Sequence, residues 1–231
     1  MRWDIAILSE PGERENNEDC VAVTSGDAGI CTVLCDGLGG HDAGEVASKC
    51  VCDSVTAAFE KAPEGADIGE LVCELLQNAQ DELMKMQIEL DKQNGMKTTA
   101  CCLLIQDGKT AAAYVGDSRI YQFRKNKVLL RSSDHSIPQY LVNIGEIKER
   151  DIRHHPDRNK LLRVMGSEWE TPRYQRLKLE EPVCGDAFLL CTDGFWEWIE
   201  EKDMERFLKR TSCSEEWLNT CLLYTSDAAD D

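Results

Sequence analysis

The chain has no hydrophobic run near the ~20 residues that a membrane-spanning helix needs, which excludes such a helix. Basic residues are scarce: 26 lysines and arginines stand against 43 aspartates and glutamates, for a formal net charge of -17. A surface so acidic would repel phosphate groups, so nucleic-acid binding is not expected. No signal peptide is recognisable at the first residues, and we expect a cytoplasmic protein with no membrane association.

Cysteine spacing typical of zinc sites is also missing, although the chain has 12 cysteines. No Cys-x-x-Cys occurs, and three other close pairs do not fit a zinc site either: Cys31/Cys35, Cys50/Cys52 and Cys101/Cys102. Because most cysteines lie within apolar runs, we expect reduced, buried thiols. A zinc site at His135, His154 and His155 is disfavoured, since no fourth ligand has suitable spacing.

A short apolar run at residues 33–35 breaks at Asp36 into a glycine-rich turn and then into a helix. Gly37, Gly39 and Gly40 allow backbone conformations that other residues resist, so backbone groups there can approach a ligand closely. Taken alone, the stretch is equally typical of an ordinary strand-to-helix connection with a surface aspartate.

The same pattern occurs twice more. Apolar residues 111–115 lead to Asp117, and apolar residues 187–191 lead to Asp193. If these strand ends meet, the carboxylates would repel one another and raise each other's pKa unless cations lay between them. Clusters of oxygen ligands suit magnesium or manganese better than zinc.

Hydrophobic periodicity predicts the helices and strands. The expected helices cover residues 43–59, 67–90, 137–144, 195–199 and 204–208. The expected strands cover residues 3–8, 20–23, 30–35, 98–105, 110–115, 120–123, 128–130, 174–179 and 187–191. Short turns at Asp107-Gly108 and Lys125-Asn126 suggest that the strands between 98 and 130 form one antiparallel meander. No linker divides the 231 residues, a length that suits one domain with a sizeable core.

Four motifs follow one another along the chain: Arg14-Glu15-Asn16-Asn17-Glu18-Asp19, Asp36-Gly37-Leu38-Gly39-Gly40-His41, Gly116-Asp117-Ser118-Arg119 and Thr192-Asp193-Gly194. In this order and spacing they resemble the metal-dependent serine/threonine protein phosphatases of the PPM family (type 2C), in its bacterial form. The resemblance covers about residues 3–210. It implies an α+β fold, a four-layer α-β-β-α sandwich with two central, mostly antiparallel sheets, each covered by helices.

The resemblance also implies a metal centre with two Mg²⁺ or Mn²⁺ ions. Asp36 would bridge the two ions, the Gly37 carbonyl would bind one of them, and Asp193 would bind the other. Asp117 would help to hold a third, weaker ion. A water between the metals would lose a proton and attack phosphorus in line, without a covalent phosphoenzyme.

Other matching positions would serve the same reaction. Arg14 would hold the substrate phosphate, a task that suits the planar guanidinium, and Glu18 and Asp19 would orient metal-bound waters. Some family members have a histidine, the proposed general acid, where this chain has Leu38. Leucine cannot donate a proton, so the general acid stays open between His41 and a metal-bound water.

The C-terminal part departs from the family pattern. In the family, the segment after the helix at 204–208 carries a last metal-binding aspartate followed by asparagine, and this chain has no such pair there. We therefore expect residues 1–220 to form a PPM-type phosphatase domain that is incomplete at its C-terminus. Residues 221–231 are interpreted as a non-native tail and left out of the fold prediction.

Two functions are compatible with these residues. The first is hydrolysis of phosphoserine and phosphothreonine in proteins, opposing a bacterial serine/threonine kinase, by a monomer. The alternative is a catalytically weak or inactive pseudophosphatase that binds or regulates phosphoproteins. Arg14, Asp36, Asp117 and Asp193 favour catalysis, whereas the absent last aspartate favours the alternative. A nucleotide-binding glycine loop ranks third, because no Gly-Lys-Ser/Thr follows the glycines.

Overall fold

The computed structural model describes residues 2–12, 16–26, 29–39, 43–92 and 95–229. The first sheet contains, in spatial order, β1 (Asp19–Gly26), β2 (Gly29–Leu38), β4 (Ala100–Gln106), β5 (Lys109–Val115) and β8 (Gln175–Leu177), with β3 (Lys97–Thr98) paired to β2. The second sheet contains β7 (Lys127–Arg131), β6 (Arg119–Arg124) and β9 (Ala187–Cys191). Every described strand pairing is antiparallel.

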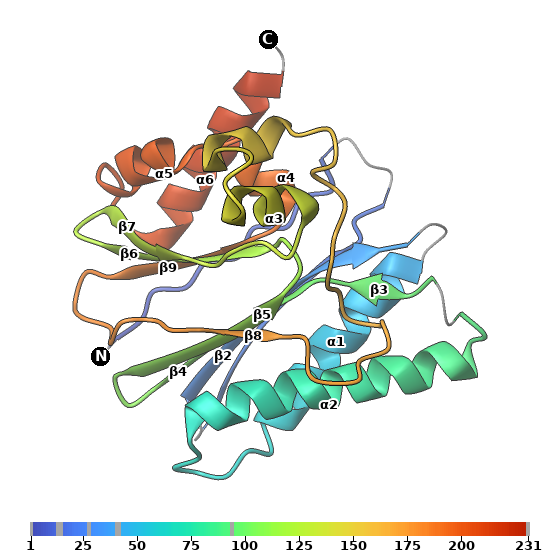
Figure 1. Ribbon diagram of the computed structural model, residues 1–231. Helices are drawn as coiled ribbons and strands as arrows, with labels where there is room; N and C mark the ends of the chain where they lie inside the picture. The colour runs from blue at the N-terminus through green and yellow to red at the C-terminus, as the bar shows by residue number, and fades with distance from the viewer. Residues whose placement is uncertain (1, 13–15, 27–28, 40–42, 93–94, 230–231) are drawn as a thin grey trace.

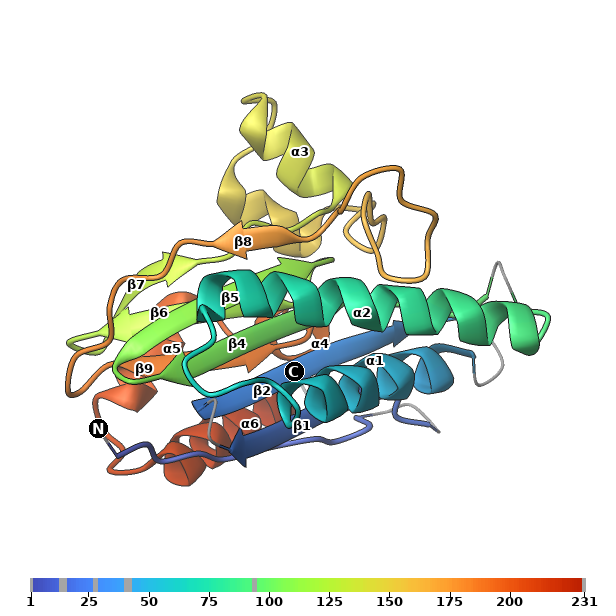
Figure 2. The same ribbon diagram turned by 90° about the horizontal axis from the view of Figure 1, so that it is seen from below.

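Helices cover the outer faces of both sheets (Figures 1 and 2). The first sheet is covered by α1 (Ala43–Phe59) and α2 (Ile68–Glu89). The second is covered by α4 (Asp193–Trp196), α5 (Glu201–Leu208) and α6 (Ser214–Ala229). A segment between β7 and β8 carries α3 (Ile137–Asn143) and the 3₁₀ helix η1 (Glu149–His154). The predicted four-layer α-β-β-α sandwich is confirmed.

Apolar side chains form three layers between these elements. Successive residues of β4 point to opposite faces: Cys102 and Leu104 pack beneath α1 and α2, and Cys101 and Leu103 pack between the sheets. Because both faces of this sheet are covered, its central strands are continuously apolar rather than alternating.

Both predicted hairpin turns are confirmed. The turn between β4 and β5 has φ angles of 48° at Asp107 and 76° at Gly108, and the turn between β6 and β7 has 52° at Lys125 and 59° at Asn126. Two consecutive left-handed residues match the twist of the flanking strands, which is why two-residue hairpins use them.

The prediction of one continuous meander is wrong. Strands β4 and β5 pair in the first sheet and β6 and β7 in the second, and residues 116–118 carry the chain from one sheet to the other. Gly116 has φ of +104°, and a Cβ there would lie 2.5 Å from Cγ2 of Thr99. The chain can change sheets here because glycine removes both obstacles.

The predicted strand at residues 3–8 is also wrong. The side chains of Ile5 and Ile7 are exposed, so the weak apolar alternation does not mark a buried sheet face. The segment is instead held at Asp4, whose carboxylate accepts hydrogen bonds from the backbone nitrogen (2.7 Å) and hydroxyl (2.8 Å) of Ser214. These bonds satisfy a backbone donor at the start of α6.

Helix α6 continues across the predicted boundary at residue 220. Cys221 is buried in the layer beneath the second sheet, and the rings of Tyr224 and Phe207 lie 5.4 Å apart. Trp217, Cys221 and Tyr224 follow helical spacing, which places them on one face. The division between residues 220 and 221 stays a prediction.

None of the described helices combines the length and the apolar composition that crossing a membrane requires.

Candidate metal centre

Four aspartates from distant parts of the chain lie at one end of the two sheets. Strand pairing puts Asp19 opposite Asp36, while Asp117 follows β5 and Asp193 follows β9. The antiparallel order β2, β4, β5 brings the last residues of β2 and β5 to the same edge. The carboxyl groups of Asp36 and Asp193 are within hydrogen-bonding reach of each other. The fold thus gathers all four aspartates singled out in the sequence.

Their charges conflict strongly. Burial and then the carboxylates of Asp193, Asp19 and Asp117 raise the pKa of Asp36 well above its usual value. Burial and then Asp193 and Asp134 raise the pKa of Asp117 in the same way. Asp36 and Asp117 are only 6% and 5% exposed, so water cannot screen this repulsion effectively. Cations bound between these carboxylates would offset the repulsion.

Two buried threonines hold the backbone of Asp36. Its nitrogen donates a hydrogen bond to Oγ1 of Thr99 at 2.9 Å, and its carbonyl accepts one from Oγ1 of Thr98 at 2.8 Å. Both side chains are fully buried, so these bonds fix the strand end from which the carboxylate projects. Neither threonine stands out in the sequence, where the pair is only a polar start to an apolar strand.

Two contacts join the second sheet to this cluster. The hydroxyl of Thr192 donates a hydrogen bond to Oδ2 of Asp19 at 2.9 Å. The indole Nε1 of Trp196 donates one to the backbone carbonyl of Asp117 at 2.9 Å. The sequence predicts only that the aromatic residues after Asp193 pack, and it gives no sign of these partners.

Gly37 and Glu18 lie against the first turn of α1. The nitrogen of Gly37 donates a hydrogen bond to the carbonyl of Glu18 at 3.1 Å. A Cβ on Gly37 would lie 2.4 Å from the carbonyl oxygen of Gly44, and a Cβ on Gly44 would lie 2.8 Å from Oε1 of Glu18. Glycines therefore allow β1, β2 and α1 to meet at the aspartate cluster.

Two other residues are predicted to take part in the reaction, Arg14 as the phosphate ligand and His41 as a candidate general acid. Both lie outside the described residues. Leu38 pairs with Lys97 at the end of β2, and its side chain has no proton to donate. The individual roles of the site residues stay predictions.

The donors around Asp36 fit hydrated magnesium or manganese. They are carboxylate oxygens, and such hard ligands suit these ions. In the part of the chain that the structure describes, no three aspartate, glutamate, histidine or cysteine side chains form a preformed ligand cluster.

All twelve cysteines are free thiols, and most are buried, as predicted. Burial raises the pKa of Cys35 and Cys101, both inside the first sheet. A thiol whose pKa is raised is a poor nucleophile and a poor metal ligand, so these cysteines pack as small apolar residues.

The ring of His135 contacts other protein groups through both of its nitrogens and one face. Its Nδ1 accepts a hydrogen bond from the nitrogen of Gly116 at 3.1 Å, and its Nε2 lies 3.2 Å from Oε1 of Gln175. Its ring stacks on Tyr114 with centroids 5.0 Å apart. Burial lowers the pKa of His135 below 6.5, which favours the neutral ring that this geometry needs.

We expect the Asp134-His135 segment to make folding sensitive to acid. The pKa of His135 is lowered in the folded state, so below about pH 6.5 the unfolded chain binds a proton more readily and stability falls as the pH decreases. The nearby charges of Arg163 and Asp134 act on this pKa in opposite directions. Replacing His135 by glutamine should flatten the fall in the free energy of unfolding between pH 7 and 5, as measured by urea denaturation. His155→Gln is the control, and a His135→Gln profile parallel to wild type would contradict the expectation.

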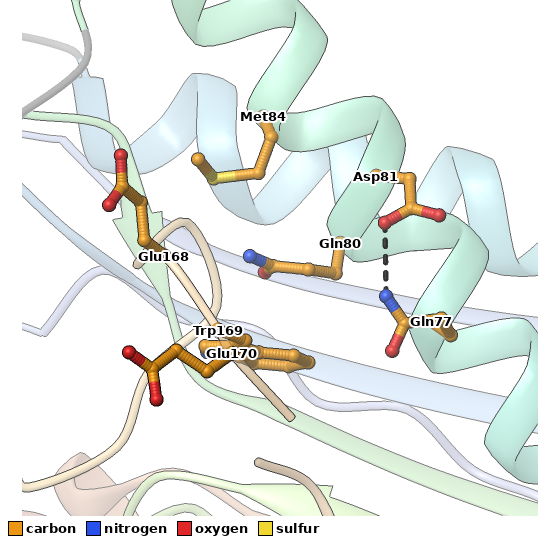
Figure 3. Close-up of a pocket in the computed structure, with 7 residues that line it drawn as sticks. All are labelled: Gln77, Gln80, Asp81, Met84, Glu168, Trp169 and Glu170. Carbon is orange, nitrogen blue, oxygen red and sulfur yellow. Dashed lines mark hydrogen bonds between the residues drawn. The ribbon is translucent and has the colours of Figure 1, made fainter. Parts of the chain in front are cut away.

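A recess of about 400 Å³ lies elsewhere, between α2 and the loop at residues 168–170 (Figure 3). It is lined by Gln77, Gln80, Asp81, Met84, Glu168, Trp169 and Glu170. None of the four clustered aspartates lines it. The candidate centre is therefore assigned from its charges and contacts, not from the size of a cavity.

Known proteins provide an independent comparison. Residues 12–221 match the family model described as Protein phosphatase 2C. The serine/threonine phosphatase stp of Listeria welshimeri is 31% identical over 201 residues, which cover 85% of this chain and 79% of the relative. A single-site variant of a bacterial serine phosphatase superposes with a TM-score of 0.83 at 27% identity, covering 96% of this chain and 90% of the other. The catalytic domain of the serine/threonine protein phosphatase PstP in complex with two manganese ions gives a TM-score of 0.77 at 26% identity, with 93% and 87% covered.

Proposed function

This chain belongs to the protein phosphatase 2C family, and we propose that it hydrolyses phosphoserine and phosphothreonine esters in proteins with the help of bound Mg²⁺ or Mn²⁺. The observation that carries the proposal is the meeting of Asp36, Asp193, Asp19 and Asp117 at one end of the sandwich, where burial and repulsion raise the pKa of Asp36. Divalent ions would relieve the repulsion between carboxylates so placed, and carboxylate oxygens are the ligands that Mg²⁺ and Mn²⁺ prefer.

Each residue has a distinct part in the proposal. Asp36, which has other carboxylates around it, would bind both of two ions. The Gly37 carbonyl would bind one of these ions, and Asp193 would bind the other. Asp117 would hold a third ion more weakly. When bound, the ions would supply an activated water at neutral pH and offset charge on the phosphoryl group. The related domain that contains two manganese ions supports a binuclear site.

Other residues would orient the reactants. Asp19, fixed by its hydrogen bond from Thr192, and Glu18, beside the start of α1, would position water. Arg14 would bind the phosphoryl oxygens through the N–H donors of its planar guanidinium. We further propose a cytoplasmic monomer that acts on proteins modified by a bacterial serine/threonine kinase; the name of the Listeria relative supports the serine/threonine phosphatase activity alone.

Phosphate release from p-nitrophenyl phosphate and from a phosphothreonine peptide tests the proposal. Mn²⁺ should increase both rates about 1,000-fold over the same protein in EDTA, because the ions stabilise the transition state by several kcal/mol. A phosphotyrosine peptide of the same sequence is the specificity control and should react more slowly. If no release depends on metal, a pseudophosphatase that binds phosphoproteins without turnover becomes the better description.

A further inference from the structure

A fully buried arginine, Arg119, lies two residues after Asp117 of the aspartate cluster. Arg119 is 1% exposed, and its guanidinium donates two hydrogen bonds to Asp134, from Nε to Oδ1 at 2.9 Å and from Nη2 to Oδ2 at 2.7 Å. A two-point contact fixes both the position and the plane of the guanidinium. Because a buried ion pair contributes little net stability, stability is a weak explanation for this one.

The face of the guanidinium lies on Trp196. Its Cζ is 3.5 Å from the ring centroid, well within the ~6 Å range of cation–π contacts. Trp196 is itself 1% exposed, and its indole N–H reaches the carbonyl of Asp117 at 2.9 Å. Trp196 is also the last residue of α4, whose first residue is Asp193. One indole is thus linked to Asp117 through a hydrogen bond and to Asp193 through a single helical turn.

The same arginine is also connected to α5 and, through Glu201, to η1. Its Nη1 donates a hydrogen bond to the hydroxyl of Tyr121 at 3.3 Å, and that hydroxyl donates to Oε1 of Glu201 on α5 at 3.0 Å. Arg153 of η1 donates to the other oxygen of Glu201 at 2.8 Å. A network with this many fixed partners resists small shifts of any one member.

We infer that Arg119 and Trp196 are positioning residues that keep Asp117 and Asp193 in place for divalent-ion binding. The inference rests on the proposed function, because it takes these aspartates to be metal ligands. The four carboxylates repel one another, so strand ends that are not braced would move apart before an ion could bind. Through their contacts, Arg119 and Trp196 connect the end of β5 to the end of β9 and so resist this movement.

The chain offers a matched pair of substitutions for the test. Trp196→Phe keeps an aromatic ring under Arg119 and removes the N–H that holds Asp117, together with part of the buried ring volume. Trp217→Phe removes the same kind of bond, since the indole of Trp217 is 4% exposed and donates to the carbonyl of Met204 at 3.1 Å, away from the aspartates. Isothermal titration of the intact protein with Mn²⁺ alone gives the affinity, and thermal unfolding in EDTA gives the stability.

Trp196→Phe should weaken Mn²⁺ binding about 5- to 10-fold, the worth of one buried hydrogen bond, and Trp217→Phe should leave it unchanged. Both should lower the unfolding temperature in EDTA by a similar amount, about 2–4 °C. Arg119→Lys keeps the positive charge but loses the planar group that makes two parallel hydrogen bonds to Asp134. It should weaken Mn²⁺ binding at least as much as Trp196→Phe does.

Equal Mn²⁺ affinities for Trp196→Phe and Trp217→Phe would overturn the inference, and so would a wild type that binds no Mn²⁺. A wild type that binds Mn²⁺ yet hydrolyses no phosphoester would contradict the proposed function alone. In that case the Mn²⁺ affinities of Trp196→Phe and Trp217→Phe still decide whether Trp196 positions the aspartates. If Arg119→Lys does not fold, the tryptophan pair decides by itself.

Discussion

Replacing Asp36 by asparagine is expected to lower phosphate release at least ~1,000-fold and, at the same time, to stabilise the metal-free protein. Asparagine keeps the shape of the side chain but cannot neutralise two cations. It also removes a buried charge that faces Asp193, Asp19 and Asp117. In EDTA at pH 7, the free energy of unfolding should rise by on the order of 1–4 kcal/mol, similar to the gain when buried ion pairs are replaced by uncharged residues.

The pH dependence follows from the direction of the shift. The pKa of Asp36 is higher in the folded state than the usual 3.8, so the unfolded chain loses this proton first and the folded state is penalised as the pH rises above about 3.8. The stability gained by Asp36→Asn should therefore shrink as the pH falls toward 4. Mn²⁺ should stabilise wild type by mass action and stabilise the variant much less.

Urea denaturation in EDTA and in Mn²⁺, together with the p-nitrophenyl phosphate assay, provides both measurements. Asp53→Asn is a suitable control, because that carboxylate is 64% exposed and pairs with Lys49 on the same helix. A metal-free Asp36→Asn protein that is less stable than wild type would show that the carboxylates are not in conflict.

Replacing Gly37 by alanine is expected to cause a large loss of stability, about 3 kcal/mol or more. The new Cβ would lie 2.4 Å from the carbonyl oxygen of Gly44 and 2.6 Å from that of Glu18. Both are backbone atoms, so no side-chain rotation can relieve the overlap. The φ angle of Gly37 is not left-handed, so glycine is needed here for space and not for conformation. Displacing the end of β2 should also abolish Mn²⁺ binding, because Asp36 would move with it.

Gly26→Ala is the matched control in the same pair of strands, since a Cβ there meets nothing within 4 Å. Its free energy of unfolding should stay within about 1 kcal/mol of wild type. Urea denaturation of both variants makes the comparison. A Gly37→Ala protein as stable as Gly26→Ala would mean that the first turn of α1 moves away at little cost.

Much of the fold was predictable because its signals are local. The 3.6-residue periodicity of α1 and α2, the apolar runs of the central strands, and the turn residues from Asp107 to Gly108 all act within a few positions of one another. Asp36, Asp117 and Asp193 could be singled out for the same reason, since each directly follows an apolar strand. At residues 3–8 the local signal was too weak to decide, and Ile5 and Ile7 are exposed.

The sequence by itself determined most of the helices and strands, the family and the aspartates that meet. Only the tertiary structure decided how the strands divide between two sheets and which groups hold the aspartates in place. Thr99 acts on Asp36 across 63 positions of the chain, and Trp196 acts on Asp117 across 79. Hydrogen bonds over such separations depend on where strands cross and pack, and no pattern of neighbouring residues encodes that.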